Sequence, residues 1–171
     1  CVYWGEVTIN AKDGFMRRTM FGLALLIAWV GSPIFTKAGD NAARPMTPGV
    51  HLLQFEYAHD GQTQTRSYAV YLPHGIEQAK ATGRKFPVIL SLVGLGARGL
   101  SREDAFREGP IQLMKMRPNY EKTVPYIVVR PMIAPGQRSD NPVYAKYAVA
   151  ALRDFMADYP VDPKQIHLSG L

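Results

Sequence analysis

The first apolar segments of residues 50–171 predict a hairpin of two strands. The segments 50–57 (VHLLQFEY) and 66–72 (RSYAVYL) are rich in aromatic and β-branched residues, and apolar positions alternate with polar ones in the second. The turn signal Asp60-Gly61 lies between them. Two such segments joined by a short turn are typical of antiparallel strands.

Three later runs are almost continuously apolar: 86–93 (FPVILSLV), 126–130 (YIVVR) and 166–168 (IHL). Runs of this kind are typical of strands that are buried on both faces of a sheet. A helix between such strands implies parallel pairing through right-handed crossovers. The pattern therefore predicts an α/β domain whose mostly parallel sheet carries an antiparallel hairpin at its N-terminal edge.

Residues 142–159 carry the clearest helical pattern in the chain. Asp140 or Asn141 can cap this helix, Pro142 occupies the favoured first position, and Pro160 ends it. Apolar side chains follow at spacings of three and four, which is the pattern of one buried helix face. We interpret this face as core packing rather than as a cofactor site. Its members are Tyr144, Tyr147, Ala148, Ala151, Leu152, Phe155 and Tyr159.

A different pattern precedes the domain, in residues 16–38. Arg17 and Arg18 are followed by an apolar run from Phe21 to Val30 and then by smaller residues. This order is typical of a secretory signal peptide, whose apolar core is about 7–15 residues long. Ser32-Pro33 interrupts the run too early for a membrane-spanning helix, which needs about 20 apolar residues. An uncleaved anchor and a buried core helix are the alternatives.

The leader predicts how the chain is divided. Because the first residue is Cys1 rather than Met, we expect residues 1–15 to be upstream sequence read through in frame. Small residues make Ala38 or Ala43 suitable for cleavage. The expected segments are a signal peptide at 16–38, a linker at 39–49 and the α/β domain at 50–171. The mature protein is then expected to be secreted or periplasmic and free of the membrane.

Charge and cysteine content exclude several classes of function. The net charge of the chain is +6, but residues 39–171 hold 16 Lys/Arg against 12 Asp/Glu, and these charges are scattered. Nucleic-acid binding needs a clustered basic face, so no nucleic-acid partner is expected. Cys1 is the only cysteine, which excludes an intrachain disulfide. The histidines are not spaced as metal ligands, and no metal or other cofactor is expected.

Residues 94–99 (GLGARG) match G-x-G-x-x-G directly after a predicted strand. One interpretation is a dinucleotide-binding loop. Against it, Gly109-Pro110 interrupts the helix that should follow, and Arg130-Pro131 stands where an acidic residue should hold the ribose. The other interpretation is an oxyanion loop, whose backbone N–H groups stabilise negative charge on a carbonyl oxygen. In α/β-hydrolases one such donor follows the third strand, and the strand count therefore favours this interpretation.

Three segments extend the argument to a family. They are YLPHGIEQAKATGRKFPVILSLVGLGARG (71–99), YIVVRPMIAPGQ (126–137) and DYPVDPKQIHLSGL (158–171). Together they resemble the N-terminal half of secreted α/β-hydrolases, in particular the polyhydroxybutyrate-depolymerase-like esterases and the related predicted peptidases. The resemblance covers about residues 50–171 and is most specific over 159–171. It implies an α/β-hydrolase fold that is truncated after strand five.

The resemblance also implies a catalytic arrangement. Leu95 would give one oxyanion N–H, and Gly94 and Gly96 would shape the turn around the substrate. Gly170 would be the first glycine of the G-x-S-x-G elbow, so that the nucleophile follows Leu171 directly. Acid and base are expected further on, because the four histidines present precede the elbow. The 171 residues alone are therefore expected to be inactive.

One departure from the family keeps alternatives open. Val93 stands where the family has a histidine before the first glycine. That histidine helps to hold the loop, and its replacement weakens the expectation for the loop geometry. The main expectation is an exported serine hydrolase that cleaves small-molecule or polymeric esters without a cofactor. A peptidase of the same family and a non-catalytic secreted binding module of the same fold are the alternatives.

Overall fold

The computed structural model describes residues 44–94, 97–117, 119–137 and 142–170. The strands are β1 (Gly49–His59), β2 (Gln62–Leu72), β3 (Phe86–Ser91), β4 (Ile127–Pro131) and β5 (Val161–Ser169). The helices are α1 (Ile76–Thr82), α2 (Gly109–Met116), α3 (Tyr120–Thr123) and α4 (Pro142–Asp158), with a 3₁₀ turn at Asp104–Phe106.

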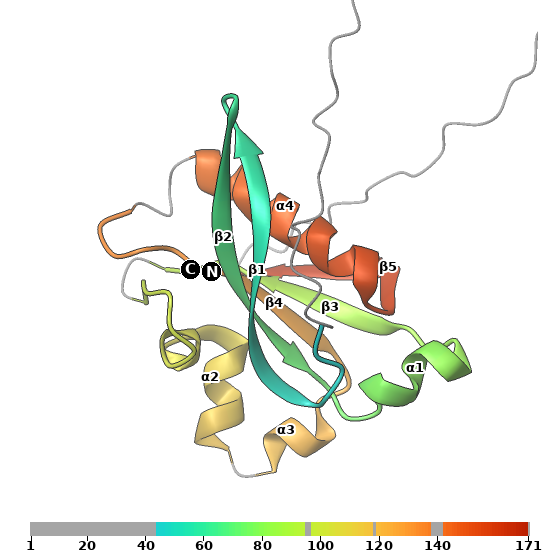
Figure 1. The fold of residues 1–171 in the computed structure, drawn as a ribbon. Coiled ribbons are helices and arrows are strands. Elements are labelled where there is room, and N and C mark those ends of the chain that lie inside the picture. The colour runs from blue at the N-terminus through green and yellow to red at the C-terminus, as the bar shows by residue number, and fades with distance from the viewer. Residues whose placement is uncertain (1–43, 95–96, 118, 138–141, 171) are drawn as a thin grey trace, which may run out of the picture. The chain divides into compact units, whose positions relative to one another are not determined.

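The five strands form one mixed sheet in the order β1-β2-β4-β3-β5 (Figure 1). β1 and β2 pair as an antiparallel hairpin around Asp60 and Gly61, as predicted, and β2 continues antiparallel against β4. β4, β3 and β5 are parallel to one another. The sheet therefore confirms the predicted parallel core with an antiparallel hairpin at one edge.

Helices cover both faces of this sheet. One core contains Ile127 and Val129 of β4 together with the buried faces of α1 and α4. The opposite core contains Val128 of β4 with residues of α2 and of the segment around α3. Figure 1 shows α2 and α3 on one side of the sheet and α4 on the other. Successive strand residues point to opposite faces, which is why β4 is apolar at every one of these positions.

The long helix is the element that the sequence predicts best. α4 begins at Pro142, ends two residues before Pro160, and buries the predicted apolar face. The expected caps Asp140 and Asn141 lie outside the described residues. This apolar face packs into the main core, as expected from the interpretation that it serves core packing rather than cofactor binding.

Three local expectations differ from the structure. The helix α1 was not among the expected elements, since residues 77–85 are mostly polar and only Ile76 and Ala79 of α1 are buried. β3 ends at Ser91 rather than at residue 93, since the Val93 N–H donates to the Tyr144 hydroxyl instead of to a strand. β5 begins at Val161 rather than at residue 166, because an irregular register between Phe86 and Val88 lengthens its pairing with β3.

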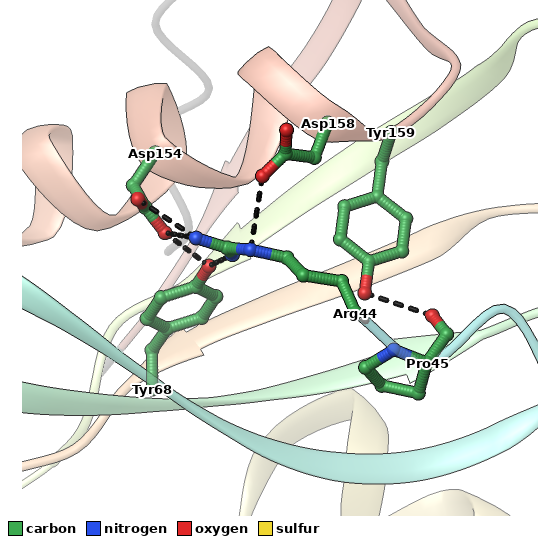
Figure 2. Close-up of polar contacts among 6 residues, drawn as sticks. All are labelled: Arg44, Pro45, Tyr68, Asp154, Asp158 and Tyr159. Atoms are coloured by element: carbon green, nitrogen blue, oxygen red, sulfur yellow. Dashed lines mark hydrogen bonds and ion pairs between the residues drawn. The ribbon is translucent and has the colours of Figure 1, made fainter. Parts of the chain in front are cut away.

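A polar cluster ties the start of the described chain to α4 (Figure 2). The Arg44 guanidinium donates to both carboxylate oxygens of Asp154, at 2.7 and 2.9 Å, and lies 2.9 Å from Asp158. It also donates to the Tyr68 hydroxyl, which in turn donates to Asp154. The Tyr159 hydroxyl donates to the Pro45 carbonyl at 2.8 Å. Residues 44 and 45, in the predicted linker, are thus held against the domain.

The predicted leader, residues 16–38, lies outside the described residues. Within the described part of the chain, the helices are all too short or too polar to cross a membrane.

Candidate active site at the carboxyl end of the sheet

The carboxyl ends of β3, β4 and β5 meet at one edge of the sheet, because these strands are parallel. In open α/β sheets this edge is where ligands bind. The ends of β3 and β5 are joined directly: Ser91 pairs with Ser169, and the Leu92 N–H donates to the Ser169 carbonyl at 2.7 Å. A Cβ atom on Gly170 would lie 3.0 Å from the Leu92 Cβ. The predicted elbow glycine therefore lies against Leu92, two residues before the glycine loop.

Gly94, the first glycine of that loop, is held by Glu108. Its N–H donates to Glu108 Oε1, and a Cβ atom at Gly94 would lie 2.9 Å from Glu108 Oε2. This close approach requires a residue without a side chain. Because the Gly94 N–H is already bonded to a carboxylate, Gly94 shapes the turn and does not supply a free donor.

Arg130 holds the same loop through hydrogen bonds of its guanidinium. Its side chain is completely buried at the end of β4 and donates to the Glu108 carbonyl at 2.7 Å and to the Ala97 carbonyl at 3.3 Å. Its guanidinium also lies 3.6 Å from the Glu108 carboxylate. Burial lowers the pKa of Arg130, and the Glu108 charge opposes this effect. Arg130, which occupies the position of the missing ribose-binding acid, therefore holds the loop directly at Ala97 and, through Glu108, indirectly at Gly94.

Val93 has no polar side chain to fix the loop, but its backbone is fixed from α4. The Val93 N–H donates to the Tyr144 hydroxyl at 3.0 Å, and that hydroxyl lies 3.4 Å from the Pro131 carbonyl. The Val93 side chain packs in the main core. Burial raises the pKa of Tyr144 to about 12, so its hydroxyl stays neutral under physiological conditions.

The far end of the loop is anchored at Gly99 and Asp104. The Gly99 N–H donates to the Ile133 carbonyl at 2.8 Å, which links the loop to the segment after β4. A Cβ atom on Gly99 would lie 2.0 Å from the Asp104 carboxyl carbon. Asp104 accepts the Ser101 backbone N–H at 2.9 Å, and this bond is the main reason why its pKa is lowered. Arg107 adds an ion pair to Asp104 at 2.9 Å.

The structure brings together only some of the residues predicted from the sequence. Gly94 and Gly170 lie at the same edge, whereas Leu95 and Gly96 lie outside the described residues, and their roles stay predictions. Sequence reasoning missed Glu108, Arg130 and Tyr144. A charged residue inside an apolar strand is rarely buried without partners, and that signal could have identified Arg130.

The histidines take no part in this edge. His51 contacts the Thr47 carbonyl at 2.8 Å, and His59 lies 3.3 Å from Asp60, while His74 and His167 are exposed. Among the described residues, no group of three histidine, cysteine, aspartate or glutamate side chains could hold a metal ion.

Comparisons with known proteins agree with this architecture. No family model and no curated protein matches the sequence. Among solved structures, a thermostable esterase is 21% identical with a TM-score of 0.53, over 70% of this chain and 34% of its own. The chain thus spans about a third of the length of that esterase. A ferulic acid esterase from Anaeromyces mucronatus is 19% identical over 82% of this chain and 55% of its own. Its TM-score is 0.41.

The sheet topology of this chain and its structural similarity to the thermostable esterase indicate the same fold. This chain has the sheet order β1-β2-β4-β3-β5, an antiparallel hairpin at one edge and helices on both faces. The described part of the chain has the α/β-hydrolase fold.

Proposed function

We propose that the protein is an exported serine hydrolase that cleaves ester bonds through an acyl-enzyme. The observation that carries this proposal is the contact between the end of β5 and Leu92, which lies two residues before the glycine loop. Gly170 lies against Leu92, and the loop that begins at Gly94 is fixed by Glu108 and Arg130. A nucleophile on an elbow after β5 would therefore be next to the backbone donors of this loop.

The proposed reaction uses the arrangement of the serine hydrolases. A serine in the elbow attacks the ester carbonyl, and a histidine later in the chain accepts the hydroxyl proton. An acidic residue orients that histidine. The Leu95 N–H and the N–H after the nucleophile stabilise the oxyanion, and the alcohol leaves with the proton from the histidine. Water then gives a proton to the histidine and attacks the acyl carbonyl, and the serine oxygen leaves with that proton as the free acid is released. The proposal requires no cofactor.

Fixed loop geometry supports this role. An oxyanion donor accelerates a reaction only if it is aimed before the charge develops, and losing one such donor costs about 100–1,000-fold in kcat. Gly94 and Ala97, the described residues that flank the predicted donor, are held by Glu108 and Arg130 respectively. Tyr144 fixes the residue before them. These three contacts take over the loop-holding role of the histidine that Val93 replaces.

A binding module of the same fold is the second candidate, and Val93 is the observation that favours it. Such a module would keep the braced loop and would not need a serine in the elbow. The family resemblance leaves a peptidase as a third candidate.

The first experiment is to determine the sequence that follows Leu171 in the gene. A serine next, then any residue and a glycine, with an acidic residue and a histidine further on, is the expected result. The gene product should then hydrolyse p-nitrophenyl acetate, and alanine in place of that serine should lower kcat by about 10⁴-fold or more. Any other residue after Leu171 would leave no nucleophile and support the binding module.

Export and cleavage are tested separately. Expression with residues 16–43 intact should place the protein in the periplasm or the medium, and N-terminal sequencing should begin at Gly39 or Arg44. Retention in the cytoplasm with the leader uncleaved would refute the proposed export and leave the proposed chemistry unaffected.

A further inference from the structure

A small pocket opens beside the glycine loop. Its lining consists of aromatic, aliphatic and polar side chains, whereas the loop is rich in glycine. The volume of the pocket is about 250 Å³. An apolar cavity of about 150 Å³ can hold benzene, so this pocket has room for one aromatic ring with a substituent. Its lining residues come from β2, from the segment after β4 and from the first turns of α4. They are Arg66, Met132, Ile133, Gln137, Val143, Tyr144 and Tyr147.

The pocket shares a side chain with the candidate active site. The Tyr144 ring lines the pocket, and its hydroxyl holds the Val93 N–H at 3.0 Å, one residue before the glycine loop. Ile133, which also lines the pocket, accepts the Gly99 N–H at the other end of that loop. The pocket therefore lies beside the residues that hold both ends of the loop.

The tyrosines offer their rings to a ligand rather than their hydroxyls. The Tyr147 hydroxyl donates to the Ser67 carbonyl and accepts the Met132 N–H, and the Tyr144 hydroxyl is bonded to Val93. With both hydroxyls occupied, these residues offer a ligand only the small accessible part of their rings, because Tyr144 is 7% and Tyr147 4% exposed and the Tyr147 ring is stacked on Phe55. A planar group fits such a surface better than a branched or strongly hydrated one.

Arg66 gives the pocket a positive charge. Its guanidinium donates to the amide oxygens of Gln137 at 3.3 Å and Gln64 at 2.7 Å, and it lies 5.8 Å from the centre of the Tyr147 ring. These partners are neutral. Within the described part of the chain, no carboxylate forms an ion pair with Arg66. Its buried Nε atom has no hydrogen-bond partner there either.

We propose that this Arg66 pocket binds the planar, negatively charged end of an ester substrate, such as an aromatic ring that bears a carboxylate. The carboxylate takes the place of an amide oxygen on Arg66, since a guanidinium binds a carboxylate more strongly than a neutral amide. The aromatic ring of the substrate contacts the accessible parts of Tyr144 and Tyr147. This inference rests on the proposed function because it names the substrate class of the same site.

Binding is measured first, because it does not require catalysis. Benzoate and its neutral analogue benzamide are titrated against the protein by isothermal calorimetry or NMR. We expect benzoate to bind at least about 10-fold more tightly than benzamide, and its affinity to fall as salt rises, since salt screens the charge pair. Equal affinity for the two probes would overturn the proposal.

Variants locate the binding. Arg66→Gln should weaken benzoate binding about 10-fold and leave benzamide binding unchanged. Arg153→Gln is the matched control, because Arg153 is an exposed arginine on α4 outside the pocket lining. Benzoate binding that survives Arg66→Gln, or that falls equally in Arg153→Gln, would show a nonspecific charge effect and refute the pocket. Circular dichroism of each variant confirms that the fold is intact.

A kinetic arm separates this inference from the proposed function. In the gene product, Arg66→Gln should lower kcat/KM for monomethyl terephthalate about 10-fold and leave methyl benzoate unaffected. An equal change for the two esters would overturn the substrate class while the esterase stands. Selective benzoate binding without any ester hydrolysis would instead overturn the proposed function while the pocket stands.

Discussion

Removal of the Arg44 side chain tests how the chain after the predicted leader is held to the domain. The variant Arg44→Ala deletes the bonds to Asp154, Asp158 and Tyr68 in one step (Figure 2). Cleavage after Ala38 or after Ala43 would leave Arg44 in the mature protein. The cluster is therefore expected in the mature protein whichever site is used.

The cost follows from the burial of the three charged groups. The side chains of Arg44, Asp154 and Asp158 are each about a fifth exposed, at 21%, 19% and 23%. Breaking a fully buried pair costs about 3–5 kcal/mol, and an exposed pair contributes about 0–1 kcal/mol. This cluster lies between these limits and is bidentate, so we expect Arg44→Ala to lower the free energy of unfolding by about 2–3 kcal/mol. Burial alone would lower the pKa of Arg44, but its bonds to Asp154 and Tyr68 outweigh burial and raise it.

Urea unfolding measures this loss as a shift of the midpoint at constant slope. Arg153→Ala is the control, because it removes an exposed arginine from the same helix, and it should change stability by less than about 0.5 kcal/mol. A double-mutant cycle with Asp154→Ala should give a coupling of about 1 kcal/mol or more. A loss in Arg44→Ala no larger than that of the control would show that this contact does not stabilise the fold.

Three further predictions concern the loop and the core. Arg130→Met should lower the free energy of unfolding by about 3 kcal/mol or more, because it removes the positive charge beside the Glu108 carboxylate and leaves the Glu108 and Ala97 carbonyls without this donor; a urea midpoint within error of the native one would refute this role of Arg130. Gly99→Ala should destabilise the protein far more than Gly61→Ala, since the new methyl group meets Asp104 only at residue 99; equal thermal midpoints would contradict this. Buried tyrosines with a pKa of about 12 should ionise well above pH 10 in absorbance titrations, and stability should fall as pH rises from about 10 to 12, because the unfolded chain loses these protons first; titration at pH 10 with the fold intact would refute their burial. They are Tyr71, Tyr144 and Tyr159.

Local pattern determined most of the secondary structure. The hairpin around Asp60-Gly61, the buried strand β4 and the helix that begins at Pro142 were all predicted, because each depends on a periodicity or turn signal within a few residues. The fold class followed from their order. Elements without such a signal were missed: α1 buries only Ile76 and Ala79, too few to produce a helical pattern.

Tertiary structure decided which polar groups meet. Arg44 contacts Asp154 across 110 residues of sequence, and Arg130 contacts Ala97 across 33. Nothing near either arginine in the sequence indicates its partner, since strand pairing and helix packing place these groups together. The same holds for Arg66, which β2 carries beyond the end of β4 to the Tyr147 ring. The sequence alone therefore determined the five strands, the long helix α4 and the position of the glycine loop along the chain. The charges that brace that loop and line the neighbouring pocket depended on the folded sheet, because only long-range packing brings them within a few ångströms of each other.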